Sequence, residues 1–154
     1  MIYKRLLFLF ATFMMFSISG CNAQDNAGDK CTSMLREFYT NYSKIWAIKP
    51  VPLPKDHYII IDSLQEKYCT QKLRKEAKEW FEDGHDFLTN DWGIDVESLE
   101  TMTIIKDTTK ENTYIVSYIV DSYPVTPDNP VKKQVVLYVT VAKEGESCRL
   151  DFVR

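Results

Sequence analysis

The spacing of apolar residues along the chain changes near residue 99. Over residues 30–47, apolar side chains recur every three or four positions, which places them on one side of an α-helix. The same spacing predicts two further helices, over residues 58–69 and from Thr70 to near Gly84. After residue 99, apolar and polar side chains alternate, as they do in half-buried β-strands. The pattern therefore predicts helices first and strands afterwards.

Residues that start and stop helices define the bounds of these elements. Asp29 and Thr70 are suited to cap the N-terminal ends of the first and third helices. Gly84 marks the end of the third helix. Between the first two helices, three prolines favour an extended connection: Pro50, Pro52 and Pro54.

The second half of the chain predicts four strands: residues 99–106, 113–120, 133–142 and 148–153. Gly145, in the turn before the last strand, favours a hairpin in which this glycine has a positive φ. Residues 121–132 contain three prolines and are predicted to form a long surface loop. Helices followed by strands define an α+β fold, in which the helices pack on one face of an antiparallel sheet.

The first 20 residues have the features of an export signal. Lys4 and Arg5 precede an apolar run from Leu6 to Ile18, which is 13 residues long. A helix needs about 20 apolar residues to cross a bilayer, so this run is too short to span one. It fits a cleaved signal peptide instead.

The end of this segment resembles the lipobox of bacterial lipoproteins, in which an aliphatic residue and two small residues precede a cysteine: Ile18, Ser19, Gly20 and Cys21. The resemblance implies cleavage before Cys21 and acylation of its sulfur and its amino group. Two or more acyl chains would then anchor the protein stably to a membrane. An ordinary secretory signal followed by an unmodified cysteine is the alternative.

These features divide the chain into a signal peptide (1–20), a flexible polar tether (21–29) and a single α+β domain (30–154). The predicted location is the bacterial cell envelope, with the domain facing the periplasm or the cell surface. Loss of Lys4 and Arg5 leaves 19 − 2 = 17 basic side chains against 22 acidic ones, a net charge of −5. The sequence contains no basic patch, so binding to nucleic acid is not expected.

Three cysteines follow Cys21: Cys31, Cys69 and Cys148. Their spacing matches no zinc or redox motif. An oxidising compartment favours one disulfide and one remaining thiol, and all three pairings are open on the sequence alone. We favour Cys31–Cys148, because these residues lie at the start of the first helix and at the last strand, which should pack together.

Several short stretches resemble the bacterial lipoproteins grouped as domain of unknown function 3828: FYTNY (38–42), KYCTQKL (67–73), DFLTNDWGID (86–95), YIVSY (114–118) and VTVAKEGESCRLDFV (139–153). The order of elements is similar to that of the cone-shaped nuclear-transport-factor-two-like superfamily. That resemblance implies a long first helix that lies across a curved four-stranded sheet and closes a pocket. The lipoprotein family has no assigned activity, so the resemblance implies no catalytic residues.

Aromatic side chains on the first helix and the strands could line such a pocket, with an apolar body and a polar rim. The candidates for ligand binding are Tyr39, Tyr42, Trp46, Tyr114 and Tyr118, with Tyr138 as a further aromatic on a strand. The alternative is a core that these large side chains simply fill.

Candidate groups for catalysis are few. The sequence has two histidines, His57 and His85, and a nucleophilic pair would need Cys69 within hydrogen-bond reach of His85. A buried or disulfide-bonded Cys69 is the more common situation. The acidic residues near His85 do not have the spacing of a calcium-binding loop and are expected to cap turns: Asp83, Asp86, Asp91 and Asp95. No metal and no cofactor is predicted.

The sequence leaves two classes of function open. The first is a non-catalytic lipoprotein of the envelope that binds a protein partner or a small ligand in the helix–sheet groove. The second is a small hydrolase or isomerase that uses the interior of the cone as its active site. Paired ionisable groups with shifted pKa values in an open interior would favour the enzyme.

Overall fold

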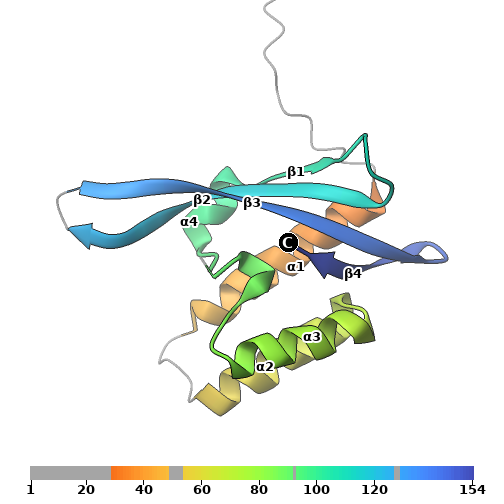
Figure 1. The fold of residues 1–154 in the computed structure, drawn as a ribbon, viewed down its shortest axis with the longest axis horizontal. Helices are drawn as coiled ribbons and strands as arrows, with labels where there is room; N and C mark the ends of the chain where they lie inside the picture. The colour runs from red at the N-terminus through yellow and green to blue at the C-terminus, as the bar shows by residue number, and fades with distance from the viewer. Residues whose placement is uncertain (1–28, 49–53, 92, 127–128) are drawn as a thin grey trace, which may run out of the picture.

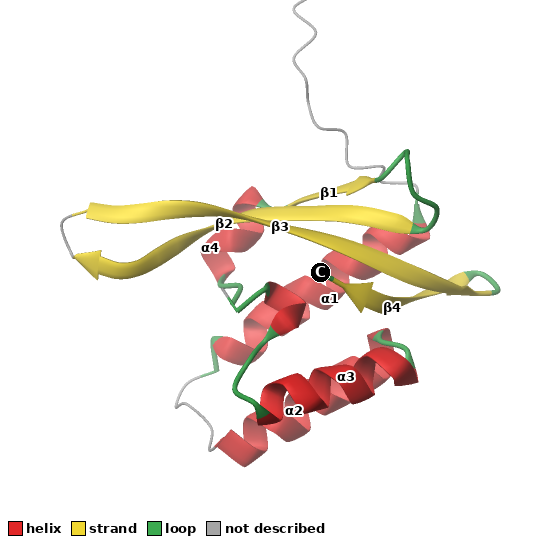
Figure 2. Ribbon diagram, viewed as in Figure 1, coloured by secondary structure: helices red, strands yellow, loops and turns green. Residues whose placement is uncertain are grey.

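The computed structural model describes residues 29–48, 54–91, 93–126 and 129–154. The predicted signal peptide and Cys21 lie outside the described residues, as does the tether up to residue 28. The elements follow in the order α1 (Lys30–Trp46), α2 (Pro54–Tyr68), α3 (Gln71–Glu82), η1 (Phe87–Thr89), α4 (Val96–Thr101), β1 (Thr103–Lys106), β2 (Thr113–Thr126), β3 (Asn129–Glu144) and β4 (Ser147–Val153). Helices therefore precede strands, which confirms the α+β fold class (Figure 2).

The four strands form one antiparallel sheet in the order β1-β2-β3-β4. Figure 1 shows α1 crossing beneath the sheet, with α2 and α3 side by side on the far side of α1. Strand residues alternate between buried and exposed positions, so that Val116 and Leu137 face the helices while Val136 and Tyr138 are partly exposed. The helices thus cover one face of the sheet, as the sequence predicts.

The predicted caps are present. The side chain of Asp29 accepts a hydrogen bond from the backbone N–H of Cys31, and Thr70 Oγ1 accepts one from Leu73. Both bonds satisfy backbone donors that the first turn of a helix leaves free. Gly145 has the positive φ expected in the β3–β4 turn.

Three predictions about the elements are wrong. Pro54 begins α2 instead of lying in the extended connection, because the fixed φ of proline suits the first position of a helix. Residues 121–132 are not a long loop, because β2 and β3 continue to pair from Asp121–Lys132 to Thr126–Asn129. The register shifts between Ser122 and Thr126, and an irregular register tolerates a proline, which has no backbone N–H.

Residues 99–101 belong to α4 and not to the first strand. The side chain of Asp95 accepts hydrogen bonds from the backbone N–H of Ser98 at 2.7 Å and from its hydroxyl at 2.6 Å. This local cap begins a short helix that the alternating pattern of apolar residues does not reveal.

The joint between α2 and α3 is tied to the last strand. Cys69 bridges Leu150 in parallel pairing, and the backbone N–H of Thr70 donates to the Leu150 carbonyl at 2.8 Å. The Thr70 hydroxyl also donates to Asp151 at 2.9 Å. The α2–α3 pair is therefore fixed to the sheet at this end.

Cys31 and Cys148 form a disulfide in the structure, with their Cα atoms 5.4 Å apart. This is the pairing favoured from the sequence, and it joins the start of α1 to β4. Cys69 is buried and free.

Candidate functional site

The tyrosines predicted to line a pocket are core residues instead. Tyr39, Tyr42, Tyr114 and Tyr118 are at most 1% exposed. The prediction that these rings border an open helix–sheet pocket is therefore wrong, and the alternative of a filled core holds. The fifth candidate, Trp46, is 43% exposed, and its ring lies 5.2 Å from that of His57.

Each buried tyrosine hydroxyl has an acceptor inside the protein. Tyr39 donates to the Leu88 carbonyl at 3.3 Å, and Tyr118 donates to the Gly93 carbonyl at 3.1 Å. Tyr114 donates to the Asp29 carboxylate. Because these bonds satisfy the polar end of each ring, large aromatic side chains can fill the core without a cost for an unpaired hydroxyl.

Asp86 is a half-buried carboxylate that holds this region together. Its Oδ2 accepts hydrogen bonds from Tyr42 at 2.9 Å and from the Thr89 hydroxyl at 2.8 Å, and its Oδ1 accepts from the Leu88 N–H at 3.1 Å. Burial raises the pKa of Asp86 although these hydrogen bonds act to lower it. The bond from Tyr42 links α1 to η1, and the other two hold the first turn of η1, so the role of Asp86 is structural.

The Cys69–His85 pair required for a nucleophilic mechanism does not form. His85 is exposed, and its Nδ1 lies 3.2 Å from Asp91 Oδ2. Burial raises the pKa of Cys69 to about 12. A thiol with this pKa is protonated at neutral pH and is not a nucleophile.

Cys69 is therefore expected to resist alkylation in the folded protein. At pH 8 a thiol with a pKa near 12 is ionised to roughly one part in ten thousand, so iodoacetamide should leave native Cys69 unmodified under conditions that fully label the urea-unfolded chain. Mass spectrometry of the quenched samples measures this. Labelling of the native protein at the unfolded rate would contradict the burial of this thiol.

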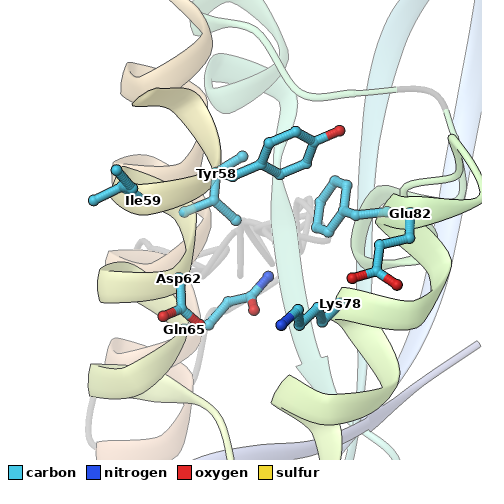
Figure 3. A pocket seen from close by; sticks show the side chains of 8 residues that line it. Tyr58, Ile59, Asp62, Gln65, Lys78 and Glu82 are labelled. Atoms are coloured by element: carbon cyan, nitrogen blue, oxygen red, sulfur yellow. The ribbon is translucent and has the colours of Figure 1, made fainter. Parts of the chain in front are cut away.

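A cavity of about 400 Å³ lies between α2 and α3 (Figure 3). We refer to it as the α2–α3 pocket, and it is lined by Tyr58, Ile59, Ile61, Asp62, Gln65, Lys78, Phe81 and Glu82. Its volume is within the range typical of small-molecule sites. The sequence pattern does not reveal this pocket, since its positions share one side of each helix but mix apolar, polar and charged residues.

Two bridges between the helices bound this pocket. At one end, the rings of Tyr58 and Phe81 lie 6.2 Å apart in an edge-to-face arrangement. Toward the α2–α3 joint, Arg74 forms ion pairs with Asp62 at 3.2 Å and with Glu66 at 3.6 Å. Ile61, which is 3% exposed, adds an apolar wall.

The polar side of the α2–α3 pocket contains an unsatisfied amide. Gln65 is only 3% exposed, and its Nε2 has no hydrogen-bond partner among the described residues. Figure 3 shows the Gln65 amide and the Lys78 ammonium pointing into the space between the two helices. A buried donor without a partner costs about 1–3 kcal/mol, which an acceptor on a ligand would offset.

The sequence matches no established family profile and no curated protein. The resemblance to domain of unknown function 3828 therefore stays a prediction. A solved structure with the same fold is a protein of unknown function from Bacteroides thetaiotaomicron VPI-5482. It is 18% identical, the match covers 86% of this chain and 96% of that chain, and the TM-score is 0.64. At this identity the similarity concerns the fold alone.

Two further properties concern the described residues. They contain no group of three or more side chains arranged to hold a metal ion. None of the described helices combines the length and the apolar content that crossing a membrane requires.

Proposed function

We propose that this protein is a lipid-anchored lipoprotein of the bacterial cell envelope that binds a small ligand in the α2–α3 pocket and does not turn it over. The observation that carries the proposal is the unpartnered, buried Gln65 amide beside an aromatic wall. An apolar cavity with a few convergent polar groups is the usual form of a ligand site.

The absence of turnover rests on the chemistry of the lining residues. Catalysis needs a positioned nucleophile, base or metal, and no serine, cysteine or histidine is among the described residues that line the α2–α3 pocket. Its ionisable side chains Asp62, Lys78 and Glu82 are exposed to water, and Asp62 is paired with Arg74, so none is held as a desolvated base or nucleophile. The hydrolase or isomerase alternative would use the interior between α1 and the sheet. Buried tyrosines fill that interior, which weighs against the alternative.

The proposed lipid anchor is tested separately from ligand binding. Cys21→Ala should release the protein from the membrane fraction and abolish labelling with a palmitate analogue, because the acylated sulfur is removed. Cys69→Ala is the matched control and should leave both properties unchanged, since Cys69 is buried in the domain. Unchanged membrane association of the Cys21→Ala variant would contradict the anchor.

Ligand binding in the α2–α3 pocket is testable with N-phenyl-1-naphthylamine, a neutral apolar dye that becomes fluorescent out of water. We expect residues 21–154, carrying Cys21→Ala to remain in solution, to bind one dye molecule saturably. Phe81→Ala should weaken this binding about tenfold, because it removes one of the two rings of the aromatic wall.

Trp80→Ala is the control for this test. Trp80 precedes Phe81 on α3 and is 45% exposed, but it does not line the α2–α3 pocket. We expect its loss to leave dye binding within about twofold of the unmodified chain. Absence of saturable binding, or equal losses in the two variants, would overturn the proposal.

A further inference from the structure

We infer that the ligand of the α2–α3 pocket is a small zwitterion with an apolar side chain, of the kind that a free aromatic or branched α-amino acid represents. The inference rests on the proposed function and specifies its ligand. It follows from three sets of groups that face the same cavity: hydrogen-bond donors, an acceptor and an apolar wall.

The hydrogen-bond donors of the pocket, Gln65 and Lys78, suit a carboxylate on the ligand. Gln65 Nε2 lacks an acceptor, and the terminal torsion of a glutamine turns easily, so the amide is able to present its N–H groups to the cavity. Lys78 forms no ion pair with any described residue, and Figure 3 shows its ammonium directed toward the Gln65 amide across the gap. A carboxylate between these two groups would receive a charge-assisted hydrogen bond and an ion pair.

The hydrogen-bond acceptor of the pocket, the Glu82 carboxylate, suits an ammonium group on the ligand. Glu82 lies one helical turn after Lys78 on α3 and has no ion pair with a described residue. The other carboxylate of the pocket, Asp62, is already paired with Arg74 at 3.2 Å. A ligand with a carboxylate alone would place a second negative charge near the exposed Glu82, whereas a zwitterion complements both Lys78 and Glu82.

The remaining wall suits an apolar side chain. Tyr58, Phe81 and Ile61 offer two ring faces and a buried aliphatic group next to the charged residues. An α-amino acid carries its ammonium group, its carboxylate and its side chain on one carbon atom. This matches a pocket in which free charges of both signs adjoin one apolar wall.

The test compares three competitors that share one phenyl body. Phenylalanine carries both charges, 3-phenylpropionate only the carboxylate, and phenethylamine only the ammonium. Displacement of N-phenyl-1-naphthylamine from residues 21–154 carrying Cys21→Ala measures their affinities. We expect phenylalanine to bind at least about tenfold more tightly than either analogue, because each charged hydrogen bond contributes about that factor.

Substitutions then assign each charge to its partner. Gln65→Leu and Lys78→Gln should weaken phenylalanine and 3-phenylpropionate several-fold and leave phenethylamine unchanged. Glu82→Gln should weaken phenylalanine and phenethylamine and leave 3-phenylpropionate unchanged or tighter. Lys75→Gln is the control, since Lys75 is an exposed lysine of α3 that does not line the pocket.

The outcomes separate the inference from the proposed function. If the dye binds as expected but phenethylamine or 3-phenylpropionate competes as well as phenylalanine, or if none of the three competes, the zwitterion is wrong and the ligand pocket stands. If the dye itself does not bind saturably, both the zwitterionic ligand and the proposed ligand pocket are contradicted. Lys78→Gln and Glu82→Gln change exposed side chains, so they test the assignment even if Gln65→Leu does not fold.

Discussion

Replacing Cys148 with serine is expected to lower the free energy of unfolding by about 4–5 kcal/mol. The Cys31–Cys148 disulfide joins residues 117 positions apart, so it removes a large share of the conformational freedom of the unfolded chain. It also fastens the start of α1 to β4, two elements that are far apart in sequence. Urea unfolding followed by circular dichroism measures the change.

Reduction provides the internal control for this experiment. Dithiothreitol should lower the stability of the unmodified chain to that of the Cys148→Ser variant and should have no further effect on the variant. Peptide mapping without reduction should recover one cross-linked pair that contains Cys31 and Cys148. A stability that does not respond to reduction, or a linked peptide that contains Cys69, would contradict this disulfide.

The predictions that succeeded depend on local chemistry. Asp29 and Thr70 cap helices through their own side chains, within three residues along the chain. The change of apolar spacing from three or four residues to two reflects which face of each element is buried, and this is enough to establish the α+β class. Such features are readable because each depends on neighbours in the sequence.

The prediction of a pocket lined by tyrosines failed because it depends on contacts between distant segments. The hydroxyl of Tyr118 reaches the Gly93 carbonyl, and that of Tyr42 reaches Asp86. An amphipathic aromatic side chain is equally suited to a pocket rim and to a core, and the position of its acceptor decides between them. Nothing in the spacing of these residues reveals that position.

The α2–α3 pocket also depends on contacts between segments that are distant in the sequence. Gln65 is a polar residue on the buried side of α2, one turn after Ile61 and one turn before Tyr68. Its burial follows from the way in which α3 folds back along α2, with the Thr70 segment held against Leu150. Predicting this site from the sequence would have required knowing that the Thr70 segment pairs with Leu150.

Asp86→Ala is expected to lower the free energy of unfolding by about 3 kcal/mol at pH 7. The substitution leaves the buried Tyr42 hydroxyl without its acceptor, removes the cap of the Leu88 N–H and leaves the buried Thr89 hydroxyl only its bond to the residue 86 carbonyl at 3.4 Å. Asp83→Ala is the matched control, because Asp83 is an exposed carboxylate with no hydrogen bond or ion pair through its side chain to a described residue. The control should change the stability by less than about 0.5 kcal/mol.

The same carboxylate predicts a pH dependence of definite sign. Burial raises the pKa of Asp86 above its ordinary value of 3.8, so the folded state holds the proton to a higher pH than the unfolded state does. The part of its contribution to stability that depends on protonation is therefore complete below about pH 3.8 and is lost as the pH rises through the folded pKa. Asp86→Asn removes the titration and keeps one acceptor. The stability of the unmodified chain minus that of Asp86→Asn, measured by urea unfolding across this range, should fall as the pH rises. A difference that grows with pH would mean that the hydrogen bonds to the ionised carboxylate outweigh its burial.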